Sequence, residues 1–339
     1  MSDIALKIVQ DVDSYPHRYD AVGDAIQFIR ADRRALSDAT FLTDEFLPGA
    51  KSPIVIGRAE AMALVQPAPS PHFIFHSAYC CSTLLTNAFD IPGVSFGLKE
   101  PAMLNDISGW RRRGGQPPQV LEALRAAVTL LARPQSMGER VVIKPSNVIN
   151  ALAPTLLAAF PESKALLLYT PLENYLASIA KKGMWGRLWV RELFVKLGKD
   201  GLTDYGFSAE DIMQQTDLQI AAIGWLAQHR LFAIMAERLG PDRVQTLQSE
   251  MLLADPVTAM ESLSRHFGIA INDSALSEQI ARVFARNAKT GESFDSESRR
   301  AEYDNNRGLH ADEISKVVLW ANAVAAANGQ NLKLKSALS

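Results

Sequence analysis

The run His76–Thr83, HSAYCCST, has the composition of a loop that binds phosphate. The apolar strand formers Phe73–Phe75 precede it, and a helical pattern begins at Ser82. Backbone N–H groups at a helix start lack partners and lie at the positive end of the helix dipole, so they attract anions. Thr83 adds a hydroxyl. A buried strand that turns into a core helix would show the same pattern. The predicted anion-binding residues are Ser77, Ala78, Tyr79, Cys80, Cys81, Ser82 and Thr83.

This loop differs from the Walker loop of nucleoside triphosphatases. Counted back from Thr83, a Walker loop has Lys where Ser82 stands, and Gly at the positions of His76 and Cys81. Chemistry on magnesium-bound ATP is therefore disfavoured, and a nucleotide-dependent kinase is our second alternative.

Charged residues follow two further predicted strands. Lys99 and Glu100 come after the apolar run at residues 93–98, and Lys144 ends the run at residues 140–144. Open α/β sheets bind ligands at the carboxyl ends of their strands, so these side chains are expected near the loop. The alternative for Lys99 and Glu100 is a surface charge pair before a proline turn.

The order of the elements predicts an α/β fold. Apolar strands near residues 73–75, 93–98, 140–145, 164–169 and 242–247 alternate with helical patterns. Such alternation gives a parallel sheet joined by right-handed crossovers, with helices on both faces. We expect a helical appendage at 1–66, with a helix over 21–36, then a P-loop-like domain at 67–330 and a tail at 331–339.

Three segments resemble the bacterial sulfotransferase-like P-loop proteins. Between Ile143 and Lys182 the chain reads IKPSNVIN, then LLAAFPESKALLLYTPLENYLASIAKK. The family pattern has a strand ending in Lys-x-Pro, a helix, Phe-Pro-Asp-Ala, a strand ending in Arg-Asp-Pro, and a helix with an early Ser. The first loop, FIFHSAYCCSTLL, is similar to the family's Gly-x-Pro-Arg-Ser-Gly-Thr-Thr run. The resemblance covers about residues 73–182.

The resemblance implies a sulfotransferase. The enzyme would move a sulfuryl group from 3′-phosphoadenosine 5′-phosphosulfate, held at the first loop, to the hydroxyl of an acceptor. Pro171 and Ser178 would help to bind the donor. Transfer to a hydroxyl needs a general base, for which Glu100 is our first candidate and His76 our second. Lys99 and Lys144 would stabilise developing charge.

Two basic residues of the family pattern are absent. Tyr79 stands where the family has Lys or Arg, and the Arg expected near Thr170 is missing. Pro171 and Ser178 are also one residue further apart than the pattern requires. A phosphate-binding module without catalysis is therefore our first alternative.

Composition narrows the remaining possibilities. The chain has 339 residues and a formal net charge of -2, which argues against nucleic acid as a partner. Its two cysteines are adjacent, which excludes a disulfide framework, and no two of its six histidines have the spacing of a metal pair on one helix. No apolar run approaches the roughly 20 residues that span a bilayer, and the N-terminus lacks a signal peptide. We expect a cytoplasmic protein with no metal and no membrane partner; its acceptor and oligomeric state are not predicted.

Overall fold

Five parallel strands form the central sheet. The computed structural model describes residues 3–284 and 296–334, and only the backbone of residues 296–309. The strands are β4 (His72–His76), β5 (Ser95–Lys99), β6 (Arg140–Lys144), β7 (Ala165–Tyr169) and β8 (Val244–Gln248). Their order across the sheet is β5-β6-β4-β7-β8, and each neighbouring pair is parallel. All five predicted strands are therefore confirmed.

Both faces of the sheet are apolar, and the side chains of successive residues in each strand lie on opposite faces. Phe73 and Phe75 of β4 pack into one core cluster, whereas Ile74 packs into another. In the same way Ile143 of β6 faces the first cluster and Val142 the second. A strand buried on both sides has a continuous apolar run and no alternation with polar residues, which is why these strands were readable from the sequence.

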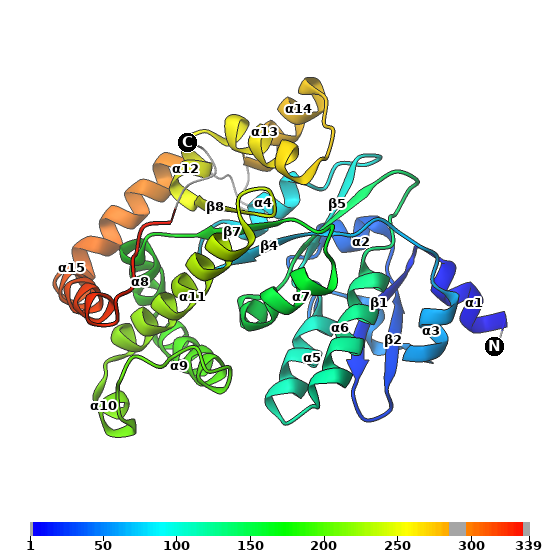
Figure 1. Ribbon diagram of the computed structural model, residues 1–339. Coiled ribbons are helices and arrows are strands. Elements are labelled where there is room, and N and C mark those ends of the chain that lie inside the picture. Colours follow the sequence, from blue (N-terminus) through cyan, green and yellow to red (C-terminus); the bar gives the residue numbers. More distant parts are fainter. Residues whose placement is uncertain (1–2, 285–295, 335–339) are drawn as a thin grey trace.

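Helices cover both faces (Figure 1). The helices whose side chains join the first cluster are α5 (Ala102–Arg112), α6 (Pro117–Leu131), α7 (Ala153–Ala159) and α11 (Asp217–Leu239). Those on the other face are α4 (Ser82–Ala88), α12 (Ser249–Ala254), α13 (Pro256–Phe267) and α14 (Asp273–Phe284). A parallel sheet with helices on both faces is the predicted fold class, which is confirmed.

A third cluster lies at the helical end of the molecule. It joins α11 to α8 (Leu172–Lys181), α9 (Gly183–Lys199) and α15 (Ser296–Ala327). The short helices η2 (Asn147–Leu152) and α10 (Ala209–Gln214) complete the segment between β6 and α11. Within the described residues no helix combines the length and the apolar character needed to cross a membrane.

The N-terminal part contains a second sheet where we expected helices. Strands β1 (Ser14–Asp20), β2 (Ala25–Arg30) and β3 (Ile54–Gly57) form an antiparallel sheet beside α1 (Asp3–Gln10), α2 (Arg33–Asp38), η1 (Pro48–Lys51) and α3 (Arg58–Leu64). The helix predicted over 21–36 is wrong. Gly23 and Asp24 make the β1–β2 turn, where Asp24 has a φ of 46°. The β-branched Ile26 and Ile29 then fit a pleated strand better than a helix.

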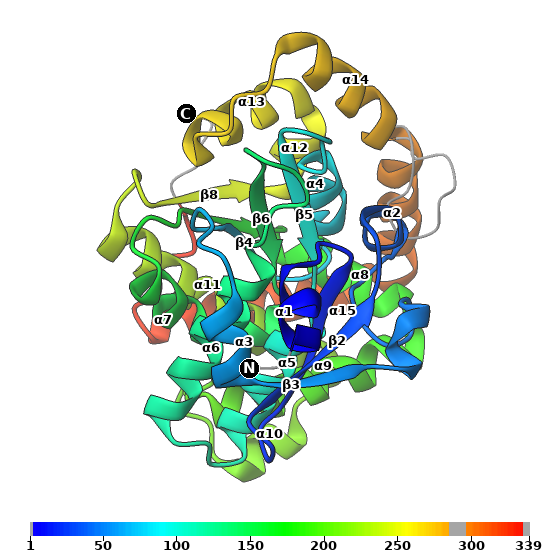
Figure 2. The same ribbon diagram turned by 90° about the vertical axis from the view of Figure 1, so that its right-hand side faces the viewer.

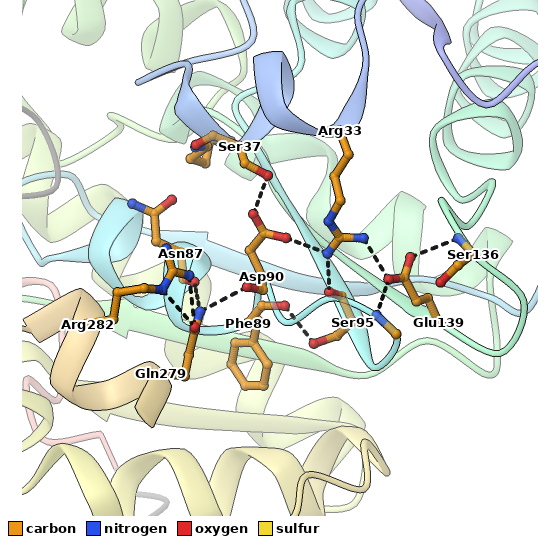
Figure 3. A network of polar contacts seen from close by, with 12 residues as sticks. Arg33, Ser37, Asn87, Phe89, Asp90, Ser95, Ser136, Glu139, Gln279 and Arg282 are labelled. Carbon is orange, nitrogen blue, oxygen red and sulfur yellow. Dashed lines mark hydrogen bonds and ion pairs between the residues drawn. The ribbon is translucent and has the colours of Figure 1, made fainter. Parts of the chain in front are cut away.

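The N-terminal elements pack against one side of the main domain and share its first core cluster (Figures 1 and 2). Helix α2 contacts the edge strand β5, and a polar network fixes this contact (Figure 3). Arg33 of α2 binds Asp90 and Glu139, both at 2.6 Å, and its guanidinium lies 4.8 Å from the ring centre of Phe96. Ser37 also donates to Asp90. Because α2 covers the free edge of β5, another chain cannot pair with it there.

Glu139 should be one of the most costly residues to replace. Its buried carboxylate accepts from Arg33 and from the backbone N–H groups of Gly93 (2.7 Å) and Ser136 (3.0 Å). Glu139→Ala would leave all three donors without this acceptor, and breaking a buried ion pair costs about 3–5 kcal/mol. Urea titration measures the loss. The control is Arg34→Ala, an exposed pair with Asp38, which should change stability by less than about 0.5 kcal/mol. Equal effects would contradict the buried role.

Three buried histidines should make the fold sensitive to acid. Burial lowers the pKa of His72, His229 and His266 to about 4. Between pH 6.5 and 4 the unfolded chain therefore binds protons that the folded chain does not, so stability falls as pH falls through this range. Nε2 of His229 donates to the carbonyl of Leu332 at 2.8 Å, and His229→Gln keeps an amide donor there without a titrating ring. Its unfolding free energy should depend less on pH than that of the parent. Identical pH profiles from pH 7 to 4.5 would contradict this.

Candidate functional site

The loop after β4 has an unusual backbone. Ala78, Tyr79 and Cys81 have φ angles of 71°, 53° and 62°, and Glu100, after β5, has 54°. Each such residue without glycine costs roughly 1–2 kcal/mol. Among the described residues only Asp24, in the β1–β2 turn, shares this conformation without being glycine. Strained residues persist where the surrounding structure enforces them, and they gather at functional sites. Successive N–H groups in left-handed conformations also form concavities that bind anions.

Side chains inside the loop enforce this shape. The N–H of Ala78 donates to Nδ1 of His76 at 3.1 Å, and the N–H of Thr170 donates to the hydroxyl of Ser77 at 3.3 Å. The thiol of Cys80 lies 3.5 Å from the carbonyl of Leu168, and burial raises its pKa to about 12. Ser77 and Cys80 therefore hold the loop against the end of β7, and His76 fixes the turn of the loop itself. The amide of Ala78 is already engaged, which narrows the predicted anion contacts to the later residues.

A buried ammonium group lies beside the start of α4. Lys144 is fully buried, and its Nζ donates to a carboxylate oxygen of Glu100 and lies 3.4 Å from the hydroxyl of Thr83. Nε2 of His76 lies 3.8 Å from the same oxygen of Glu100. The structure thus brings together four of the predicted site residues, from the ends of β4, β5 and β6 and from the first turn of α4. Glu100 keeps a partly exposed side chain, so its carboxylate is within reach of a ligand.

Lys99 lies outside this group. It pairs with Lys144 in the β5–β6 register, but its Nζ donates to the backbone carbonyl of Ser37 at 2.5 Å. The side chain is almost fully buried, and this burial lowers its pKa to about 8. Lys99 therefore fastens the N-terminal part to the sheet. Lys99 and Lys144 end neighbouring strands in register, but Lys99 binds the N-terminal part whereas Lys144 binds Glu100.

The N-terminal part also reaches the site, which the sequence did not indicate. The Nζ of Lys144 lies 5.0 Å from the ring centre of Phe41, within the range of a cation–π interaction. Leu42 holds Phe41 in place, because its N–H donates to the carbonyl of Lys99 and its carbonyl accepts from Ala102. No spacing relates Phe41 to Lys144, which is about a hundred residues away, so only the fold could place it here.

Asn150 is a second residue that sequence reasoning missed. Its side-chain amide donates to the carbonyl of His76 and to the side chain of Gln228, both at 2.9 Å. It thereby fixes the end of β4 from η2. The sequence places Asn150 only six residues after Lys144, and an amide in an otherwise apolar helical run was the available signal.

The remaining predicted residues lie around the loop. Tyr79 packs edge-on against Tyr175 and Trp189, with ring centres 5.9 and 5.6 Å away, and burial raises its pKa to about 12. It is a neutral phenol where the family has a cation. Pro171 precedes α8, and Ser178 donates to the carbonyl of Asn174 one turn earlier. Cys81 caps the start of α4 without a side-chain bond, and Ser82 is its first residue.

The described residues contain no group of three or more His, Cys, Asp or Glu side chains that could hold a metal ion. The two arginines in the last turn of α5 have a structural role, because Arg111 and Arg112 both bind the buried carboxylate of Asp200 at 2.6 Å. The sequence has a second polar, basic stretch at Arg286, Lys289 and Gly291, which lies outside the described residues.

Comparisons with known proteins give structural matches only. No family model matches the chain, and no curated protein matches it in sequence. A sulfotransferase domain from the curacin biosynthetic pathway is 13% identical with a TM-score of 0.45, and the match covers 79% of this chain and 100% of that one. The sulfotransferase domain of the Synechococcus PCC 7002 olefin synthase is 14% identical, with a TM-score of 0.42 and coverages of 75% and 96%.

Sulfotransferase STF9 from Mycobacterium avium also matches, at 12% identity and a TM-score of 0.45, over 74% of this chain and 77% of that one. Because the identities and TM-scores are this low, any function has to be argued from the site itself.

The strain in the loop can be measured by removing one methyl group. Ala78→Gly relieves a left-handed alanine, so stability should stay level or rise by about 1 kcal/mol. Ala126→Gly removes the same methyl group from the interior of α6, where glycine costs about 1 kcal/mol in backbone entropy and packing is also lost. Urea titration of both variants should show opposite directions. If Ala78→Gly is as destabilising as Ala126→Gly, the loop is not strained.

Proposed function

We propose that this protein binds the phosphosulfate group of 3′-phosphoadenosine 5′-phosphosulfate at Tyr79–Thr83, the later part of the predicted loop Ser77–Thr83, and transfers the sulfuryl group to a hydroxyl of an acceptor. The observation that carries the proposal is the buried ammonium of Lys144 beside the hydroxyl of Thr83, at the edge of the left-handed loop. A fixed positive charge, a hydroxyl and a concave backbone are together the groups that an anionic leaving group needs.

The transfer would proceed in one displacement. The acceptor oxygen forms a bond to sulfur while the bond from sulfur to the bridging oxygen breaks, and the bridging oxygen keeps the electron pair on the bisphosphate product. Lys144 is placed to stabilise that negative charge together with Thr83. The acceptor proton passes to Glu100. A carboxylate bonded to an ammonium is a weak base, so Glu100 becomes effective as Lys144 turns toward the leaving oxygen.

His76 would orient the base. Because Nδ1 of His76 accepts from the N–H of Ala78, the proton of the neutral ring is on Nε2, the nitrogen that faces Glu100. The same side chain thus holds the loop and points toward the carboxylate. Lys181, the last residue of α8, and Lys182 after it are exposed basic groups, and they would bind the 3′-phosphate of the donor.

A second function is favoured by one observation, the neutral Tyr79 in place of a cation. With Lys144 already paired to Glu100, the site would then bind a nucleotide phosphate without transferring a sulfuryl group. A kinase is a third possibility, in which ATP with magnesium would be bound despite the missing Walker lysine.

Donor binding should depend on Lys144 and not on Lys99. Lys144→Met removes the charge beside Thr83, and losing a charged partner costs about 1.5–3 kcal/mol, which is roughly ten- to a hundredfold in affinity for adenosine 3′,5′-bisphosphate. Lys99→Met is the matched control. Lys99 pairs with Lys144 in the β5–β6 register, but its ammonium donates to the carbonyl of Ser37 and not to the site. Thr83→Val gives a smaller loss in the same direction. Isothermal titration calorimetry measures all three, after circular dichroism confirms that each variant is folded.

The comparison among ligands separates the three functions. Binding of the bisphosphate together with sulfated product from a panel of hydroxyl acceptors supports the sulfotransferase. Binding without product from any acceptor supports the module. A response to ATP with magnesium alone supports the kinase. No binding of the bisphosphate by the parent, or equal binding by Lys144→Met, would refute the proposal.

A further inference from the structure

Helix α9 exposes a row of apolar side chains. Met184, Trp185, Leu188 and Val195 are 72%, 61%, 56% and 55% exposed. Their separations of three, four and seven residues put them on one side of the helix. The opposite side is buried: Val190, Leu193 and Leu197 join the third core cluster. An α-helix that is anchored on one side and apolar on the other has a second contact surface, which we call the α9 stripe.

The α9 stripe is surrounded by positive charge. Residues 181–199 contain six basic side chains and one acidic side chain, a net charge of +5, in a chain whose formal net charge is -2. Arg187 and Arg191 are paired with acidic residues of α11 and α15. Lys181 and Lys182 at one end of the helix and Lys199 at the other are exposed. The partner of this surface therefore carries negative charge around an apolar interior.

The stripe is continuous with the loop of the candidate site. The ring of Trp185 stacks on that of Trp189 at 6.4 Å, and Trp189 meets Tyr79 edge-on at 5.6 Å. Figure 1 shows α9 on the helical side of the molecule, beside α8 and α11. Two ring contacts, Trp185–Trp189 and Trp189–Tyr79, therefore connect the α9 stripe to the left-handed loop.

We propose that the α9 stripe rests on an anionic lipid surface. A bilayer combines acidic headgroups with an apolar layer just below them, and it accepts a convex helix without a complementary groove. Tryptophan and lysine at the edge of an apolar face are typical of such contacts. A second copy of this chain suits the surface less well, because a symmetric contact would place two basic segments together. Lack of an apolar run that spans a bilayer led us to expect no membrane partner, but a surface contact needs no spanning run.

Vesicle sedimentation tests the proposal on the full chain. We expect binding to vesicles of phosphatidylglycerol and phosphatidylcholine, little binding to phosphatidylcholine alone, and weakening when salt is raised, because the Debye length shortens. Trp185→Ala with Leu188→Ser should reduce binding by at least about tenfold. Lys181→Ala with Lys182→Ala should reduce it by about fivefold for each lysine.

The control replaces apolar residues elsewhere on the surface that are more exposed than those of the α9 stripe. Val22 and Met137 are 99% and 98% exposed, and Val22→Ser with Met137→Ser should bind like the parent. Light scattering of each protein reports the oligomeric state. The proposal is overturned if the parent ignores anionic vesicles or if the stripe variant binds like the parent. It is also overturned if the parent is a dimer that only the stripe variant separates, since a second copy then covers α9. None of these outcomes depends on whether the site transfers sulfuryl groups.

Discussion

The burial of one ammonium group constrains the arrangement of the whole site. An unpaired charge inside a protein is so unfavourable that it requires partners with good geometry. Lys144 finds them in the carboxylate of Glu100 and the ring of Phe41, with the hydroxyl of Thr83 nearby. These three partners come from three separate places in the chain. The sheet, the first turn of α4 and the N-terminal part must all be in register before the charge of Lys144 is compensated.

The loop after β4 achieves a left-handed backbone without glycine. Where a Walker loop uses glycine to relieve strain, this loop has Ala78, Tyr79 and Cys81, and its side chains provide the restraint. His76 and Ser77 fasten it with hydrogen bonds, and Tyr79 packs against two aromatic rings. Aromatic packing thus restrains the loop at the position where the family pattern that the sequence resembles has a cation.

The sequence revealed those parts of the fold that depend on local patterns. Strands such as Val141–Lys144 were readable because burial on both faces requires uninterrupted apolar residues, and their parallel pairing followed from the helices between them. The β1–β2 hairpin was missed because Val22, Ile26 and Ile29 have helical spacing, although Val22 is exposed in the turn. Lys99 and Phe41 show the other limit. Their roles are set by contacts between segments far apart in the sequence, which no spacing records.

The contact between α2 and β5 also affects how the chain folds as it leaves the ribosome. Arg33 can pair with Glu139 only after a further 106 residues have been synthesised, and Arg18 can pair with Asp106 only after a further 88. At a synthesis rate of about 5–20 residues per second, the first segment emerges roughly 5–20 seconds before its partner. During that interval the β1–β2 hairpin exposes the apolar face that will later join the main core. An isolated hairpin is marginally stable, so this segment is made first but is stabilised only after Glu139 has emerged.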